Sequence, residues 1–341
     1  MKNKFLIFFI LFSQVNLFAQ IKGFYSGNIL FKEESERTAP IKKSNTIGLY
    51  IGMANYLGDL GGNTGKGKSF FYDNNFKQRN FFYGFSFTHT RKEAIGFRFQ
   101  YNTGKISGSD QDVQYTSTND NAYSRYKRNL DFKTKISEAS LNIELYPFKM
   151  IPYKLAMHHF FLQPYFMLGI GVYSFNPQGS YYDEIADDYV WVDLKPLRTE
   201  GQGMKEYPFV KEYKLTQMNI PFGVGLKFPI NDKVALGIEF QGRKIFTDYL
   251  DDVSTNFVNP SVYSKYLDEE NATLARTLNN KSNIIDPDNP YMPRDKRGNP
   301  NNNDFYYSFN FTFSVRISKL KEMTKVFNRK VYKYDDNELC N

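Results

Sequence analysis

The stretch KVALGIEFQGRKIFTDYLDDVS, residues 233–254, contains the clearest indication of how this chain folds. Its first half alternates with a period of two, the pattern of a β-strand with two unlike faces. One face carries Val234, Leu236, Ile238 and Phe240. The other face mixes glycine and alanine with Glu239, Gln241 and Arg243. This combination suits a small barrel whose apolar side chains meet lipid and whose small and charged side chains fill the lumen.

A hairpin between residues 81 and 102 repeats the pattern. Its apolar positions are Phe81, Tyr83, Phe85 and Phe87 on the first strand and Ile95, Phe97, Phe99 and Tyr101 on the second. The short charged turn Arg91-Lys92-Glu93 joins the two strands. Arg98 falls on the inner face, where a charge suits a polar lumen opposite a carboxylate better than an apolar core. The hairpin therefore predicts two neighbouring membrane strands.

Eight strands of this kind follow from the alternation along the chain. They span about residues 46–56, 81–91, 95–102, 132–146, 161–175, 215–228, 234–243 and 304–317. The connections after the second, fourth and sixth strands are short, whereas the others are long. Outer-membrane barrels have this arrangement, with short periplasmic turns, long extracellular loops and both termini in the periplasm. We predict an all-β fold, an eight-stranded antiparallel transmembrane β-barrel whose lumen is just filled by side chains.

The N-terminus indicates export. Lys2 and Lys4 precede an apolar run at residues 5–12, and Leu17-Phe18-Ala19 stands before Gln20, which predicts a secretory signal peptide over residues 1–19. We expect a periplasmic lead-in at residues 20–45, the barrel at 46–318 and a basic periplasmic tail at 319–341. At helical spacing this tail is amphipathic, so it could lie on headgroups or against an acidic partner, or it could simply be solvated.

Composition supports a barrel in the outer membrane. Aromatic residues make up 18% of the 341 residues, with 33 Phe and 26 Tyr, and membrane barrels use aromatic belts at both interfaces. The mean hydropathy is −0.54, and beyond the signal no apolar run is long enough for a spanning helix. The net charge of +8 is scattered, which favours attraction to lipid headgroups over nucleic-acid binding. The single cysteine, Cys340, excludes an intramolecular disulfide.

Charged residues on the inner strand faces form the first candidate site. They are Arg98, Glu138, Glu144, Lys227, Glu239, Arg243 and Arg316. Such a set could resemble catalytic carboxylates, but we interpret it as a polar network of salt bridges in the lumen. No Ser/His/Asp set occupies neighbouring inward positions, so we expect no catalytic residue and no cofactor.

Metal binding is not expected either. The histidines are His89, His158 and His159, and adjacent residues of a strand point to opposite faces, so the last two cannot easily share an ion. Acidic clusters at Asp248, Asp251 and Asp252 and at residues 183–188 leave calcium in an outside loop conceivable. Neither cluster has the fixed spacing of a calcium hand.

Several stretches resemble the PorG-like family of outer-membrane proteins of the type IX secretion system. They are ANYLGDL at residues 54–60, PY at 164–165 with GIGV at 169–172, LRTEGQG at 197–203, PFGVG at 221–225 and FTDYLDDVS at 246–254. The last is the most specific. The residues that we take as the motif are Asn55, Tyr56, Gly58, Asp59, Thr199, Glu200, Gly201, Gln202, Gly203, Phe246, Thr247, Asp248, Tyr249, Leu250, Asp251 and Asp252.

The resemblance implies a function that alternation and loop lengths do not. Proteins of this family are barrels associated with a periplasmic ring formed by the PorK lipoprotein and PorN, and they support secretion and surface attachment of cargo and, indirectly, gliding. The implied partners are outer-membrane lipid and the ring proteins, with no nucleic acid and no small-molecule substrate. Family members are shorter in places, so residues 260–303 are interpreted as a local elaboration without an assigned role.

Two alternatives stay open. The chain could be a passive surface barrel, an adhesin or an envelope stabiliser, which co-purification with ring proteins would distinguish. It could also be a barrel enzyme acting on lipid, which the lack of a nucleophile and base pair in the sequence disfavours.

Overall fold

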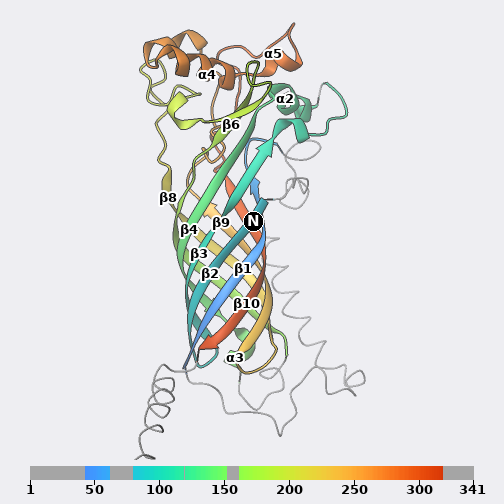
Figure 1. The fold of residues 1–341 in the computed structure, drawn as a ribbon, viewed down its shortest axis with the longest axis vertical. Coiled ribbons are helices and arrows are strands. Elements are labelled where there is room, and N and C mark those ends of the chain that lie inside the picture. The colour runs from blue at the N-terminus through green and yellow to red at the C-terminus, as the bar shows by residue number, and fades with distance from the viewer. Residues whose placement is uncertain (1–42, 62–79, 119, 152–160, 318–341) are drawn as a thin grey trace, which may run out of the picture.

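A computed structural model describes residues 43–61, 80–118, 120–151 and 161–317 (Figure 1). The predicted signal peptide, almost all of the lead-in, the basic tail and two of the three histidines, His158 and His159, lie outside these residues.

Eight long strands form a closed antiparallel barrel. They are β1 (Lys43–Leu57), β2 (Asn80–Arg91), β3 (Ile95–Ser109), β4 (Asp131–Leu145), β5 (Gln163–Ser174), β8 (Thr216–Pro229), β9 (Val234–Ile245) and β10 (Phe305–Ile317). Their order is β3-β2-β1-β10-β9-β8-β5-β4, and the pairing of β3 with β4 closes the sheet (Figure 1). The predicted eight-stranded antiparallel barrel is confirmed.

The two faces of each strand differ as the alternation indicates. On β9, Ile238 is 50% exposed, whereas the neighbouring Glu239 is 3% exposed and lies in the lumen. Across the sheet, Ile238 pairs with Phe311, which is 70% exposed. An exposed apolar belt around a closed barrel with a polar interior is the architecture of an outer-membrane β-barrel. In the part of the chain that the structure describes, no helix is long and apolar enough to cross a bilayer.

Connection lengths agree with the prediction at two of the three short turns. Residues 92–94 and 230–233 join their strands tightly, and Lys92 and Glu93 both have positive φ, as the two central residues of a type I′ turn require. The third, residues 146–162, is three residues longer than the gap between the predicted strands and contains the short helix α3 (Pro147–Met150). The long connections that the structure describes, at residues 110–130, 175–215 and 246–304, lie at the opposite end of the barrel (Figure 1).

These long connections contain structure that strand periodicity did not predict. The third strand runs seven residues beyond its predicted end at 102, to Ser109, and leads to η2 (Asp110–Asp112) and helix α2 (Asn121–Arg128). A second hairpin, β6 (Gln178–Asp183) and β7 (Asp188–Asp193), rises from the upper end of β4 and is followed by η4 (Lys195–Leu197). Residues 251–303 contain η5 (Pro260–Lys265), α4 (Glu269–Asn279) and α5 (Ser282–Ile285).

The outer loops pack around a hydrophobic core of their own. Its buried members are Leu194, Leu197, Met204, Val258, Val262, Tyr263, Ala272, Ala275 and Leu278. Helix α4 begins at a typical N-cap, since the side chain of Asp268 accepts a hydrogen bond from the Asn271 backbone N–H (2.9 Å). Residues 260–303, interpreted from sequence as an elaboration without a role, are therefore part of a folded cap on the barrel.

Replacement of Ile238 or Phe311 by arginine should destabilise the folded barrel by about 2–4 kcal/mol, because both side chains face lipid near the middle of the wall. The matched control is Thr216→Arg, an exposed position at the outer end of β8, where the cost should be about 0–1 kcal/mol. Urea titrations in vesicles, read by the different gel migration of folded and boiled barrel, measure the difference. Equal losses for all three variants would contradict the membrane placement.

Candidate functional site in the filled lumen and the outer cap

The lower lumen is filled by an ionic cluster around Arg98. Its guanidinium bridges two carboxylates, pairing with Glu239 (2.6 Å) and with Glu144. Glu144 also accepts from Lys227 (3.3 Å). The rings of Tyr50 and Tyr165 lie 5.3 and 5.5 Å from the guanidinium carbon, so the charge is held between aromatic faces.

Space for these large side chains comes from glycines on the same inner faces. A Cβ built on Gly225 would overlap the ring of Tyr165, which lies across it from β5. Gly171 is used similarly, since a Cβ there would meet the amide oxygen of Asn219. The inward glycines of β5 and β8 thus admit bulky neighbours in the lumen.

A second ionic cluster lies nearer the outer end. Arg243 pairs with Glu138 (3.2 Å), and its guanidinium lies between the rings of Phe82 and Tyr306. Glu138 also accepts from Asn219 (2.8 Å) and Tyr306 (2.5 Å). Gln100 and Gln241 bond to each other and link the two clusters, since Arg98 donates to Gln100 and Arg243 donates to Gln241. Of these side chains only Lys227 is partly exposed and the others are buried, so the lumen is a packed interior.

Six of the seven predicted lumen residues therefore meet in these clusters. Arg316 does not lie with them. It is half-buried and pairs with Thr46 at the turn end of the barrel, the end that carries the short connections. Its backbone N–H donates to the Lys233 carbonyl (2.6 Å).

The motif residues come together in the cap above the lumen. The Asp251 carboxylate accepts from the hydroxyl of Tyr56 and from the Leu60 backbone N–H (3.1 Å). The Asp252 carboxylate accepts from the hydroxyls of Thr199 and Tyr213, the latter at 2.7 Å. Three stretches that are far apart in sequence, at residues 54–60, 197–203 and 246–254, are thus linked through two neighbouring aspartates.

Glu200 is the centre of this cap. It is fully buried and pairs with Arg297 (2.8 Å). Its carboxylate also accepts from the backbone N–H groups of Ser254 and Thr255 (both 2.9 Å). Arg297 donates in addition to the Asp252 carbonyl (2.6 Å), so this pair binds the LRTEGQG stretch to both ends of the long outer connection.

The remaining motif residues shape this arrangement. Gly201 and Gly203 have φ of +73° and +74°, a backbone conformation that glycine adopts readily. Gln202 accepts from the Glu200 N–H (3.0 Å), and Asn55 accepts from the Tyr56 N–H (2.8 Å). The Asp59 carboxylate accepts from the Asn299 N–H, and the Tyr249 ring stacks on the Tyr213 ring. The Thr247 carbonyl accepts from the Asp304 N–H, and the Asp304 carboxylate accepts from the Leu250 N–H. Gly58 lies against Tyr56 and Asp304, whereas the side chain of Phe246 is 53% exposed.

Carboxyl groups of the cap are unusually hard to ionise. Burial raises the pKa of Asp248 to about 8, of Asp251 to about 7 and of Asp252 to about 6. Burial also raises the pKa of Asp304 well above its usual value, and the neighbouring Asp251 adds to the shift. No group of three or more His, Cys, Asp or Glu residues suited to a metal ion occurs among the described residues.

Comparisons with known proteins give one family match and several similar solved structures. Residues 29–190, which include β1 to β6, match a family described as Domain of unknown function (DUF6089). No curated protein matches the chain. Similar solved structures include a major outer membrane protein from Thermus thermophilus (9% identity, 81% of this chain and 100% of that chain covered, TM-score 0.35).

Two further structures are Ail, the attachment invasion locus protein of Yersinia pestis, in complex with the heparin analogue sucrose octasulfate, and the E. coli Outer Membrane Protein W. Ail is 8% identical with a TM-score of 0.33, and Outer Membrane Protein W is 12% identical with a TM-score of 0.30. Each comparison covers 81% of this chain and 100% of the other. At these TM-scores the similarities carry no argument about ligands or partners.

Some residues that build the cap were not predicted. Arg297, Asp304 and the buried pair of Arg128 with Asp110 (2.8 Å) lie in or beside irregular connections. Strand periodicity gives no information there. One feature of the sequence could have indicated Arg297 and Asp304. Each is a charged residue in a connection whose other end carries the motif residues 246–252.

Replacement of Arg98 by methionine should destabilise the barrel by about 3–5 kcal/mol, because the buried carboxylates of Glu144 and Glu239 lose their shared cation. Adding Glu239→Gln should recover part of the loss. As a control, Lys265→Met removes an exposed ion pair with Glu206 and should leave the urea midpoint almost unchanged. Urea midpoints of the refolded proteins test this, and an Arg98→Met midpoint equal to that of the control would contradict the network.

The stability of the cap should fall as pH rises from about 4 to about 8. Asp248, Asp251 and Asp252 have folded-state pKa values above those of unfolded aspartate, so folding favours their protonated forms and loses that preference as they ionise. Asp248→Asn should flatten the dependence of the unfolding midpoint on pH between 5 and 9. The exposed Glu184→Gln should leave it unchanged. A wild-type midpoint that rises over this range would reverse the predicted sign.

Proposed function

We propose that this outer-membrane barrel is a component of the type IX protein secretion machinery, which docks on a periplasmic ring of the PorK/PorN kind and supports secretion and surface attachment of cargo. The observation that carries the proposal is the convergence of three family-like stretches on one buried cap, through Asp251, Asp252 and Glu200. The resemblance therefore falls on residues that hold this structure together.

A filled lumen supports a role in assembly over a role as a conduit. Arg98 and Arg243 are fully buried across the barrel interior, and the tyrosines around them leave the cross-section packed. A barrel of this size acts through what it presents at its two ends.

The proposal puts the short connections and both termini in the periplasm. At that end, Lys149 of α3 pairs with Glu93 of the β2–β3 turn (3.3 Å), so two connections form one surface. The lead-in and the basic tail enter and leave the barrel at the same end, since β1 begins and β10 ends there. These segments would supply the contacts to the ring.

We further propose that the role is not catalytic. The one histidine within the described residues, His89, bonds to Asn45 (2.8 Å) at the turn end of the barrel, away from the buried carboxylates. Each of the inward acids Glu138, Glu144 and Glu239 pairs with a buried arginine, as in a structural network.

A passive surface barrel is the second candidate. It is favoured by the exposed apolar side chains of the cap, among them Ile185 at the β6–β7 turn (99% exposed) and Phe209 (95% exposed). An adhesin would use such side chains for contact outside the cell.

Pull-down of the tagged protein from gently solubilised membranes tests the proposal. We expect ring proteins of the PorK/PorN kind to co-purify with the full chain and to be lost, with reduced secretion, when residues 319–341 are removed. The barrel should stay folded, because β10 ends at Ile317.

The control is Ile185→Ser, which changes the β6–β7 hairpin of the cap and leaves the residues at the turn end of the barrel unchanged. It should keep ring association. Loss with Ile185→Ser and retention after tail removal would mean that the partner lies outside the cell. Absence of ring proteins from a correctly folded full chain would favour the passive surface barrel.

A further inference from the structure

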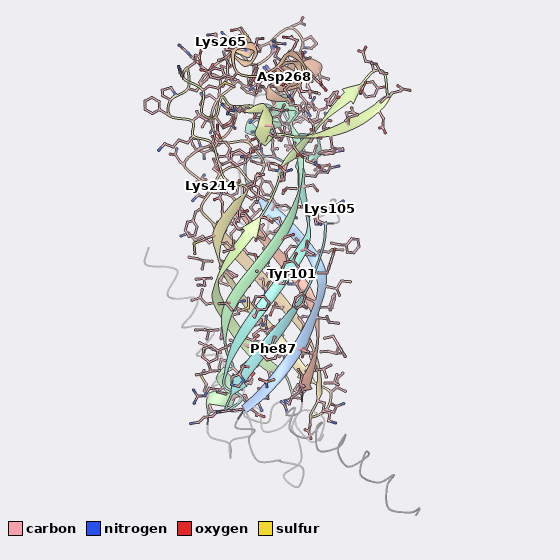
Figure 2. The ribbon with its side chains drawn as sticks, turned by 60° about the vertical axis from the view of Figure 1, so that its left-hand side comes forward. Phe87, Tyr101, Lys105, Lys214, Lys265 and Asp268 are labelled. Atoms are coloured by element: carbon pink, nitrogen blue, oxygen red, sulfur yellow. The ribbon has the colours of Figure 1, made fainter. Side chains whose placement is uncertain are left out.

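Three lysines gather on the lipid-facing wall of β3 and β4. Lys105 pairs across the strands with Lys135, and Ser107 pairs with Lys133, one outward position higher. Lys105 and Lys135 are exposed, and Lys133 is partly exposed. We call Lys105, Lys133 and Lys135 the lysine patch. Figure 2 shows Lys105 at the upper end of the barrel wall, above Tyr101 and Phe87.

No carboxylate of the described chain forms an ion pair with the patch, although Asp131 lies close enough to attract Lys133. Asp131, the nearest acid on the same face of β4, is engaged by Lys281 and by the hydroxyl of Ser180. Lys133 lies over the ring of Trp191 on β7 (4.0 Å), a contact that leaves its charge in place. Like charges directly opposite each other destabilise a sheet, so this arrangement calls for an anion from outside the chain.

The position of the patch identifies where that anion lies. Below it, the same wall is apolar, with Phe97 and Phe99 on β3 and Leu141 and Ile143 on β4, all between 42% and 60% exposed. Lys105 is four residues beyond Tyr101, which is about 13 Å along the strand. For a strand tilted by about 45°, this is about 9 Å along the normal to the bilayer. The headgroup layer extends about 5–8 Å beyond the hydrocarbon, within reach of a lysine side chain.

We propose that the lysine patch binds the phosphate of an anionic outer-leaflet lipid, whose acyl chains lie on the apolar wall of β3 and β4. Lysine ammonium groups bind phosphate as point charges, and Trp191, in contact with Lys133, is a residue type that favours the membrane interface. An acidic peptide would satisfy the charge but not the adjoining apolar wall. The proposal rests on the barrel lying in a membrane and is independent of a role in secretion.

Binding of lipid A, which carries phosphate groups, to the detergent-solubilised full chain tests the proposal by native mass spectrometry. We expect an adduct with lipid A and none with phosphatidylcholine. The double variant Lys105→Gln/Lys135→Gln should lower the affinity about thirtyfold, as expected for two lysines near a headgroup surface.

The matched control is Lys214→Gln/Lys244→Gln, which removes the same charge from exposed rim positions elsewhere; Lys244 is flanked by Ile220 and Phe305 instead of by a second lysine. Affinity should change less than threefold. Both double variants should keep the gel migration of the folded barrel.

Three results would overturn the proposal. Equal losses in the two double variants would show attraction to overall charge without a site. Displacement of lipid A by millimolar inorganic phosphate, with inorganic phosphate bound equally well alone, would show a free-phosphate site. A folded wild-type chain without a lipid A adduct would show no site at all. None of these results bears on the pull-down of ring proteins, which tests the proposed role in secretion separately.

Discussion

A backbone that crosses hydrocarbon must satisfy its hydrogen bonds within the protein, and the pairing of β3 with β4 completes this for the eight barrel strands. The rest of the structure depends on that closure. A closed sheet of eight strands leaves an interior only wide enough for side chains, so whatever the inner faces carry must pack and be neutralised there. The outer faces must be apolar over the height of the bilayer.

The inner faces meet this requirement with charge. Arg98 and Arg243 each lie between two aromatic rings and against glutamates from other strands. Removing one member of such a buried cluster is costly, because its partners remain charged in a medium of low dielectric. The clusters therefore specify which strands face one another across the lumen, in addition to the register that the backbone provides.

The cap extends the same principle beyond the membrane. Its acidic residues are buried among backbone N–H groups, hydroxyls and a few arginines, and Glu200 with Arg297 joins connections separated by about a hundred residues. The cap and the filled lumen leave the two ends and the lipid-facing wall as the surfaces through which the protein acts. The proposed ring contacts use one end, and the lysine patch uses the wall.

Alternation alone was enough to predict the barrel, because a strand with lipid on one side and a polar lumen on the other must repeat every two residues. The same signal placed Glu239 and Arg243 inside and Ile238 outside. It could not show that Arg98 bridges Glu144 and Glu239, since a period of two assigns a face and not a partner. Nor could it predict α4 or the β6–β7 hairpin within the polar loops. Contacts such as those of Asp251 with Tyr56 and of Glu200 with Arg297 join positions distant in sequence, so only closure of the barrel and packing of the cap bring them together.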